Sequence, residues 1–305
     1  MSYSISVVVP NYNGQSLLEQ NLPFVFLALK SSGINDWEII VSDDASTDNS
    51  AAFIKSKYPE IIWLSTSVNT GFSGNCNRGI RAATKELILL LNTDVTLTEN
   101  YFTEQLPCFE WPDTFGVMSL IKDKEGTIQD MAKFPAYTFA NIKGTVNYTL
   151  DQAFVPSFFL SGANALIRRT YLLQLGGFNE LFNPYYGEDL ELGIRAWRSG
   201  YRMYTHTQSY CIHPSASTIN KEKKDKVLRV QKRNKLLLHY LHLPKIEWMY
   251  FYGMMYLKSI ARLLLGNTIY FQSLLDFNNI KKKILTTNKF KYSLKEVCAI
   301  INTLQ

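Results

Sequence analysis

Two adjacent carboxylates, Glu188 and Asp189, follow a glycine in the segment YYGEDLELGIRAWRSGY. The apolar residues after them have the spacing of one buried helix face, and Gly200 predicts the end of that helix. Backbone N–H groups and the helix dipole stabilise negative charge in a first helical turn, so capping alone can explain the pair. A carboxylate there can also accept a proton from a reacting group. The same pattern predicts that Glu191 and Arg195 form an exposed ion pair.

A folded framework must position these side chains, and in the first 120 residues strand patterns alternate with helix patterns. Short apolar runs at 4–10, 37–44, 61–66 and 86–94 predict buried strands, and helical patterns follow the first three. Strands that are apolar on both faces and joined by helices predict a parallel sheet covered by helices.

Polar side chains gather where three of these strands end. Ligands of open α/β sheets bind at the carboxyl ends of the strands, so the three clusters predict one cleft. Capping and turn formation are the alternative roles of such residues. The clusters consist of Pro10, Asn11 and Tyr12, then Asp43 and Asp44, then Asn92, Thr93 and Asp94.

The glycine-rich segment NTGFSGNCNRG, residues 69–79, does not match the common nucleotide motifs. Its glycines lack the spacing of a dinucleotide-binding fingerprint, and no lysine follows as in a phosphate-binding P-loop. The cleft therefore requires a different class of ligand.

Composition and charge narrow the class of protein further. The chain has 305 residues, of which 46% are hydrophobic and 19% charged, as expected of a globular protein. Its four cysteines form no CxxC pair, which disfavours a zinc site and suits a reducing, cytoplasmic location. The first residues carry no recognisable secretion signal.

Charge divides the chain into two parts. Residues 1–218 hold 15 basic and 21 acidic side chains, whereas residues 219–305 hold 17 basic and 5 acidic ones. A basic, aromatic segment predicts a partner with phosphates, either nucleic acid or an anionic membrane surface. No nucleic-acid-binding module accompanies the basic segment, so we expect no nucleic-acid partner.

Seven motifs together resemble family 2 glycosyltransferases, and among them the bacterial rhamnosyltransferase-like subgroup. They stand in the family's order over about residues 4–215: VVVPNYNG, IIVSDDASTDNS, NTGFSGNCNRGI, LILLLNTDV, LSGANALIRR, LGGFNELF and YYGEDLELGIRAWRSGY. The resemblance implies a GT-A fold, a Rossmann-like mixed sheet flanked by helices. It divides the chain into a catalytic domain, 1–218, with a nucleotide-sugar half to about 120 and an acceptor half from 121, and a basic helical extension, 219–305.

The same resemblance implies a nucleotide-sugar donor, with a UDP- or dTDP-sugar favoured over a GDP-sugar. Asp43 or Asp44 would accept hydrogen bonds from the base or ribose, since a carboxylate is only an acceptor. Asn11 would bind the nucleotide, between Pro10 and the ring of Tyr12. Two further donor-side roles follow: Arg78 would meet a phosphate or remain a surface arginine, and Gly162 would admit the donor sugar.

A divalent metal, Mn²⁺ or Mg²⁺, is also implied. Asp94 matches the last position of the family's DxD motif, but Asn92 replaces the first aspartate and leaves one carboxylate in the triplet Asn92-Thr93-Asp94. His213 stands where some relatives place a ligand; a structural hydrogen bond before Pro214 is the alternative. His206 is expected to be structural.

For the carboxylate pair, the resemblance implies that Asp189 is the base of an inverting transfer. It would take the proton of an acceptor hydroxyl, and Glu188 would bind the acceptor or support the turn. The acceptor would be a glycan or lipid-linked glycan of cell-surface polysaccharide biosynthesis. A catalytically inactive nucleotide-sugar-binding subunit and a sugar nucleotidyltransferase are the alternatives. Residues 158–169 read as the strand before the acceptor region.

The basic extension predicts two helices with different surroundings. Residues 223–242 form the first, in which Arg233 and Asn234 either reach the active site or, by default, lie on a solvated face. Residues 246–266 are too polar to span a bilayer. They suit a helix that lies in the membrane interface, helped by the lysines at 281–283, or one that packs on the protein. We therefore expect a cytoplasmic protein, peripheral on the inner face of the cytoplasmic membrane.

Overall fold

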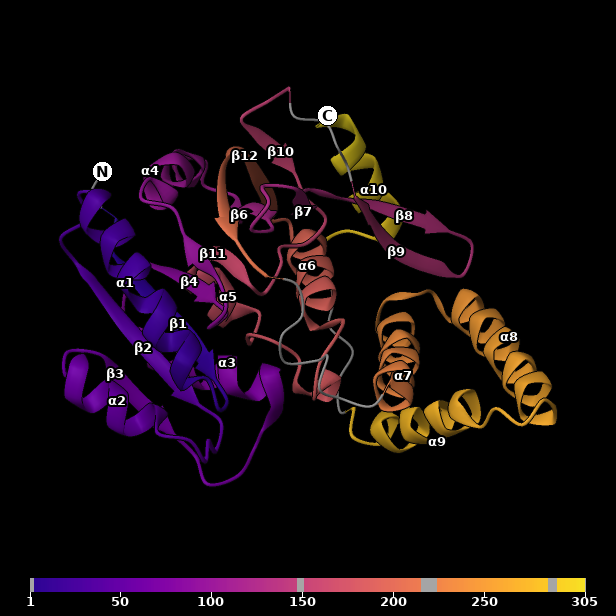
Figure 1. Ribbon diagram of the computed structural model, residues 1–305. Helices are drawn as coiled ribbons and strands as arrows, with labels where there is room; N and C mark the ends of the chain where they lie inside the picture. Colours follow the sequence, from indigo (N-terminus) through magenta and orange to yellow (C-terminus); the bar gives the residue numbers. More distant parts are fainter. Residues whose placement is uncertain (1–2, 147–150, 215–223, 285–289, 305) are drawn as a thin grey trace.

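The computed structural model describes residues 3–146, 151–214, 224–284 and 290–304. Within them a central mixed sheet of ten strands is flanked by helices (Figure 1). The three helices between residues 224 and 281 stand together at one end, and the last helix lies apart from them. The sequence's prediction of a mixed sheet with helices on its faces and a helical C-terminal region is confirmed. The predicted domain boundary between 218 and 219 lies outside the described residues.

The four strands predicted in the first 120 residues are present. They are parallel to one another and lie in the order β3-β2-β1-β4. The connecting helices are long enough to return the chain across the sheet. The elements of this half are β1 (Ile5–Asn11), α1 (Gln15–Ser31), β2 (Trp37–Asp43), α2 (Ser50–Lys57), β3 (Ile62–Ser65), α3 (Gly71–Ala82) and β4 (Leu87–Leu91).

The second half extends the sheet through antiparallel and parallel neighbours of β4. β11 is antiparallel to both β4 and β6, and β12 is parallel to β6. A separate hairpin, β8–β9, lies outside this sheet. The elements are β5 (Thr96–Leu97), α4 (Tyr101–Gln105), η1 (Leu106–Glu110), β6 (Thr114–Lys122), β7 (Ile128–Asp130), β8 (Lys133–Thr138), β9 (Asn141–Val146), β10 (Phe154–Pro156), β11 (Asn164–Arg168), α5 (Arg169–Gln174), η2 (Glu180–Phe182), α6 (Glu188–Ser199) and β12 (Arg202–Ile212).

Two hydrophobic clusters cover the two faces of the sheet. Alternate residues of β1 point to opposite faces, so that Val7 joins the cluster under α1 and α4 while Val8 joins the cluster under α3, α5 and α6. The second cluster continues into the C-terminal helices through Leu236, Trp248 and Phe277. The C-terminal helices are therefore packed on the sheet-bearing part of the chain by shared apolar burial.

Two strand predictions need correction. β3 is the edge strand of the sheet, and Ile62 is 39% exposed, so the prediction that all four strands are buried is wrong for this one. The strand predicted at 158–169 begins only at Asn164. The residues before it form a loop, whose backbone makes only isolated bonds to neighbouring segments, such as Phe158 N to Lys133 O and Asn92 N to Ala163 O.

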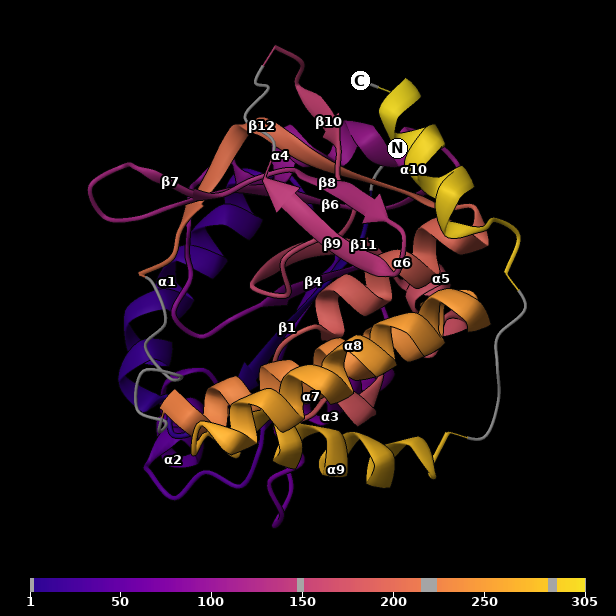
Figure 2. The same ribbon diagram turned by 90° about the vertical axis from the view of Figure 1, so that its right-hand side faces the viewer.

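Four helices make up the described C-terminal part, and Figure 2 shows α7, α8 and α9 lying beside one another on one side of the molecule. α9 contacts both α7 and α8, whereas α10 packs on β8 and α6. In the described part of the chain, no helix combines the length and apolar character needed to cross a membrane. The helices are α7 (Lys224–His242), α8 (Lys245–Leu264), α9 (Ile269–Lys281) and α10 (Leu294–Thr303).

Candidate active site

The ends of β1 and β2 meet in one hydrogen-bonded cluster, as the sequence predicted. Asn11 is fully buried, and its Nδ2 donates to Asp43 Oδ1 at 2.8 Å and to Ser46 Oγ at 3.2 Å. Ser46 N donates to the other carboxylate oxygen of Asp43 at 3.0 Å. Pro10 precedes Asn11 on β1, and the ring of Tyr12 beyond it is 51% exposed. The cluster thus places an ordered carboxylate beside an exposed aromatic ring.

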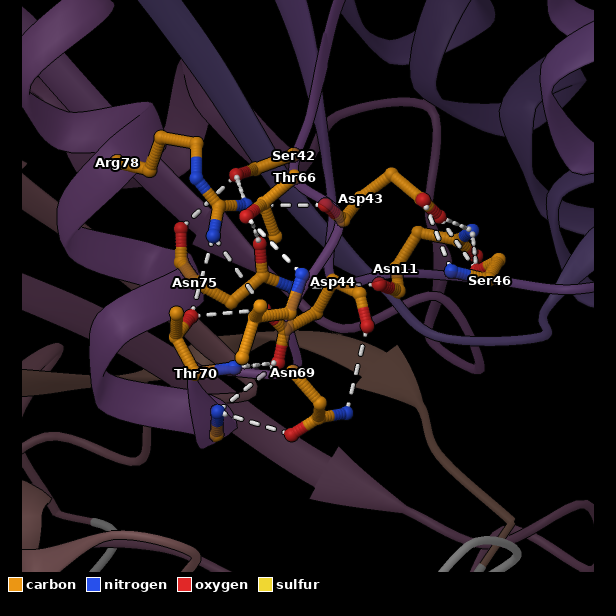
Figure 3. A network of polar contacts seen from close by, with 12 residues as sticks. Asn11, Ser42, Asp43, Asp44, Ser46, Thr66, Asn69, Thr70, Asn75 and Arg78 are labelled. Carbon is orange, nitrogen blue, oxygen red and sulfur yellow. Dashed lines mark hydrogen bonds and ion pairs between the residues drawn. The ribbon is translucent and has the colours of Figure 1, made fainter.

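Asp44 has a different role from Asp43, because α3 uses most of its acceptor capacity. Its carboxylate accepts hydrogen bonds from Thr70 N, Thr70 Oγ1 and Gly71 N at 2.7–3.0 Å (Figure 3). These bonds hold the backbone N–H groups at the beginning of α3. Of the two candidates for the base or ribose, Asp43 keeps more free lone pairs.

Arg78 lies in the same network and not on an open surface. Its Nη1 donates to Ser42 Oγ, Asp43 O and Asn75 Oδ1 at 3.0–3.2 Å, and its Nη2 lies 3.3 Å from Asp44 Oδ1 (Figure 3). The guanidinium bridges β2 and α3, so a surface arginine is the wrong description. Its contacts hold the end of β2, which carries Asp43, in place.

The third cluster meets a residue from the far end of the catalytic part. Asp94 follows β4, and its Oδ1 lies 3.0 Å from His213 Nε2. The pairing of β5 with β12 brings the two segments together, and His213 N donates to Lys122 O at 2.9 Å. Both side chains stay partly open to solvent, with 20% of His213 and 11% of Asp94 exposed.

A carboxylate and an imidazole fit Mn²⁺, which accepts both oxygen and nitrogen ligands. Within the described residues, no group of three or more His, Cys, Asp or Glu side chains could hold a metal. A metal at Asp94 and His213 therefore needs further ligands from a bound diphosphate or water. The neighbouring Asn92 and Thr93 are fixed by their backbones, since Asn92 N donates to Ala163 O and Thr93 O accepts from Asn21 Nδ2.

The acidic pair stands in the first turn of α6, as predicted. Gly187 precedes it with a φ of 90°, a left-handed conformation that glycine adopts without strain, and Gly200 ends the helix in the same conformation. Asp189 Oδ1 accepts a hydrogen bond from Leu190 N at 2.7 Å. Glu188 is buried, and its Oε2 has no hydrogen-bond partner within the described residues.

Burial controls the ionisation of this pair. It raises the pKa of Glu188, and the charge of the adjacent Asp189 raises it further. Burial also raises the pKa of Asp189, against the opposing effects of the Leu190 N–H and of the Lys133 ammonium. Both carboxyl groups therefore titrate above their ordinary range, as suits a group that must take up a proton near neutral pH.

Gly162 lies between the segment that carries Asp94 and the first turn of α6. Gly162 and Asp189 both line a void of about 10 Å³ that is otherwise apolar and too small to hold a ligand. The neighbouring Ala163 accepts a hydrogen bond from the backbone of Asn92. A Cβ at Gly162 would lie 3.2 Å from the ring of Phe72. A larger residue would press against this ring, so the close approach of chain segments here depends on glycine.

The sequence analysis missed the role of Arg233 and Asn234, whose default assignment to a solvated helix face is wrong. Asn234 is 2% exposed, and its Nδ2 donates to the carbonyl oxygens of Phe182, Tyr185 and Tyr186 at 2.7–2.9 Å. Arg233 Nη2 donates to Phe182 O at 3.2 Å. α7 thus holds the loop that leads to Glu188 and Asp189. No spacing signal in the sequence connects residues so far apart.

Glu191 and Arg195 form a buried pair, which corrects the prediction of an exposed one. Their exposed fractions are 2% and 6%, and Arg195 Nε donates to both carboxylate oxygens of Glu191 at 2.8 and 2.9 Å. His242 Nε2 lies 3.5 Å from Glu191 Oε1. The C-terminal helices cover this side of α6, which a helix pattern taken alone cannot show. His206 is structural as expected, since Ser209 N donates to its ring at 3.0 Å.

Comparison with solved structures agrees with this architecture. A mannosyltransferase from Pyrobaculum calidifontis, solved with GDP-mannose and Mn²⁺, superposes with a TM-score of 0.58 over 99% of this chain and 79% of its own, at 16% identity. GalNAc-T7, solved with UDP, GalNAc and Mn²⁺, gives 0.62 over 82% of this chain and 50% of its own, also at 16% identity. The fold is that of GT-A glycosyltransferases.

Sequence comparison then gives the family. The sequence model of glycosyl transferase family 2 matches residues 6–176, more than half of the chain, and the chain belongs to that family. An N-acetylglucosaminyl-diphospho-decaprenol L-rhamnosyltransferase of Mycobacterium tuberculosis is 24% identical over 246 residues, 72% of this chain and 78% of its own. A validoxylamine A glucosyltransferase of Streptomyces hygroscopicus is 26% identical over 239 residues, 68% of this chain but only 54% of its own length.

Proposed function

We propose that this chain transfers a sugar from a nucleoside-diphosphate sugar to a hydroxyl group of a glycan or lipid-linked glycan, with inversion at the anomeric carbon. A role in cell-surface polysaccharide biosynthesis, at the inner face of the cytoplasmic membrane, belongs to the same proposal. The observation that carries it is the arrangement of two separate acidic sites around Gly162. Asp94 pairs with His213 in the segment that follows Asn92, whose N–H donates to Ala163 O, and Asp189 lies next to Gly162 from the side of α6.

On the donor side, Asp43 would accept hydrogen bonds from the base or ribose, and Tyr12 would offer its exposed ring to the base. Asn11 and Arg78 would keep the carboxylate of Asp43 and the end of β2 in place. The M. tuberculosis relative is a rhamnosyltransferase by name, and the resemblance of this chain to such enzymes supports a UDP- or dTDP-sugar ahead of a GDP-sugar.

Asp94 and His213 would hold a divalent metal, Mn²⁺ or Mg²⁺, together with the donor diphosphate. When bound, the metal would supply positive charge that stabilises the departing nucleoside diphosphate. Asn92 contributes no charge, so the bound diphosphate would complete the site. The distance of 3.0 Å between Asp94 Oδ1 and His213 Nε2 supports a site in which the protein supplies two ligands and the diphosphate supplies the others.

On the acceptor side, Asp189 would remove the proton of the attacking hydroxyl as that oxygen bonds to the anomeric carbon and the bond to the diphosphate breaks. A single carboxylate base is sufficient for this direct displacement, whereas retention through a covalent intermediate requires a nucleophile. The raised pKa of Asp189 supports this role. Glu188 would support the turn or bind the acceptor.

The test is to incubate the protein and Mn²⁺ with UDP-, dTDP- and GDP-sugars and a lipid-linked glycan acceptor. We expect acceptor-dependent release of one nucleoside diphosphate and a product with inverted anomeric configuration by NMR. Nucleotide binding without any transfer would favour the inactive binding subunit. Formation of a nucleotide sugar from a sugar phosphate and a nucleoside triphosphate would favour the nucleotidyltransferase.

A further inference from the structure

One face of α8 is apolar and exposed along the whole helix. Its members are three, four or seven residues apart, spacings that place side chains on one side of a helix. The opposite face packs inward through Trp248, Phe251 and Ser259. The exposed face, which we call the α8 apolar face, consists of Ile246 (76% exposed), Tyr250 (54%), Leu257 (63%), Ile260 (38%) and Leu264 (82%).

The apolar face continues onto the β8–β9 hairpin. Phe139 at the hairpin turn is 62% exposed, and its ring contacts that of Tyr250 with centroids 5.3 Å apart. Met249 and Met254 on α8 are also more than half exposed. A continuous exposed apolar patch of this kind marks an interaction surface in a folded protein.

Two basic side chains of α8 lie on the side of the helix toward α9, while nearby carboxylates are already paired. Lys258 and Arg262 lie beside the ring of Tyr270, with their charged groups 5.2 and 6.0 Å from its centroid. The acidic residues of α8 and α9 are engaged elsewhere, because Glu247 accepts from Tyr137 Oη at 2.6 Å and Asp276 binds Arg229 at 2.6 Å. The α9 side of α8, which borders the apolar face, is therefore positive.

The electrostatic environment supports this description. Burial lowers the pKa of Lys235 on α7, and the ammonium groups of Lys232, Lys143 and Lys258 lower it further. These cations come from α7, the hairpin and α8, so the positive field extends over all three elements. It adds to the lysines at 281–283, which follow at the end of α9.

We propose that the α8 apolar face lies in the headgroup region of an anionic lipid bilayer, with α8 parallel to the membrane plane. Apolar side chains with tyrosines at the surface and a basic rim are the features of an interfacial helix. A second copy of the chain is a poorer occupant, because residues 219–305, with 17 basic and 5 acidic side chains, would face the same charges.

The surface is also connected to the acceptor side of the site. Glu247, at the beginning of α8, accepts hydrogen bonds from Tyr137 and from Ala140 N of the hairpin, and His239 accepts from Ile142 N. The hairpin begins at Lys133, whose charge acts on Asp189. If the proposed function holds, this membrane surface would bring a lipid-linked acceptor to the side of Asp189; membrane binding itself does not depend on it.

The test is flotation of the full chain with vesicles of neutral lipid alone or with anionic phosphatidylglycerol added. We compare wild type with the triple variant Ile246→Asp, Leu257→Asp, Leu264→Asp. The matched control, Phe24→Asp, Leu27→Asp, Leu173→Asp, adds the same charge at side chains that are 41%, 44% and 38% exposed elsewhere. Melting temperature and nucleotide binding are measured for each to show that all three fold.

We expect wild type and the control to float with anionic vesicles, and the α8 variant to bind at least about tenfold more weakly. High salt should weaken the binding of wild type. Equal binding of both triple variants, or no binding by wild type, would overturn the proposal. The proposal would also be overturned if wild type formed a dimer that does not bind vesicles while the α8 variant was a monomer. Unchanged nucleotide binding would separate any such failure from failure of the proposed function.

Discussion

His213 and Asp94, 119 residues apart in the chain, lie with Nε2 and Oδ1 at 3.0 Å. We predict that His213→Ala weakens the Mn²⁺-dependent binding of nucleoside diphosphate by about tenfold or more, since one of two protein ligands is lost. Asn92→Asp should have the opposite effect, because it restores a second carboxylate to the triplet. Titration calorimetry measures both. Identical metal dependence in His213→Ala and wild type would remove His213 from the metal site.

Asp189→Asn should lower kcat by a factor of about 10²–10⁴, the usual contribution of a general base. Donor binding should not change, because the proposed role of Asp189 is toward the acceptor and Asp43, Asp94 and His213 are left intact. The matched control is Glu188→Gln, the same chemical change one residue earlier, which should retain most of the turnover. Steady-state rates and nucleotide affinity are measured for both variants. Turnover by Asp189→Asn at the wild-type rate would identify another base.

Turnover should also fall in acid at a higher pH than an ordinary aspartate would give. Asp189 accepts a proton only when ionised, and its pKa is raised in the fold. The rate should therefore decline as the pH falls through this raised pKa, above the ordinary value of about 3.9. A pH profile of kcat measures the pH at which this decline occurs. A flat rate down to pH about 4 would contradict the assignment.

Glu188→Gln should stabilise the protein near neutral pH. A carboxyl whose folded pKa is raised contributes its full stability below its unfolded pKa, and that contribution declines as the pH rises from there through the folded pKa. An amide at this buried position carries no charge to desolvate. Thermal melting should show the variant above wild type at neutral pH and the two equal below pH about 4. No difference at either pH would show that Glu188 is well solvated or paired.

The buried cluster beneath α6 should make the protein sensitive to acid in two steps. His242 is buried and its pKa is lowered, so its stability contribution is lost as the pH falls below the ordinary histidine value of about 6.5. The Arg195 guanidinium lowers the pKa of Glu191 to about 2 despite burial. Its contribution is present above the ordinary glutamate pKa and is lost as the pH falls toward about 2.

Removing the carboxylate of Glu191 tests the same cluster directly. Glu191→Gln leaves Arg195 without its charged partner and should lower the free energy of unfolding by about 3–5 kcal/mol. An exposed pair would contribute at most about 1 kcal/mol. Urea unfolding of this variant beside Glu86→Gln, whose partly exposed carboxylate pairs with Arg168, supplies the comparison. Equal small losses in both variants would contradict burial of the Glu191 pair.

The parallel strands and the start of α6 were predictable because their signals are local. A run of apolar residues between polar ones indicates a buried strand, and Gly187 and Gly200 bracket the acidic helix. The mixed half of the sheet came from the family resemblance, since antiparallel pairing of β11 with β4 depends on contacts between distant segments.

The errors at Glu191 and Asn234 have one cause. Each side chain looks like a polar residue on a solvated helix when its own helix is read alone. In the fold, α7 contacts the loop before α6, and its last residues lie against Glu191. A segment some 50 residues away buries these side chains without changing the hydrophobic pattern of α6 or α7, so only the packed structure shows the burial.

The central claim is that the carboxyl end of the sheet binds a nucleoside diphosphate together with a divalent metal. Titration of UDP, dTDP and GDP into the purified wild-type chain, each with and without Mn²⁺, tests it most directly. The account predicts binding of one nucleotide, UDP or dTDP, that requires the metal. Binding of none of the three, or equal binding with and without Mn²⁺, would contradict it.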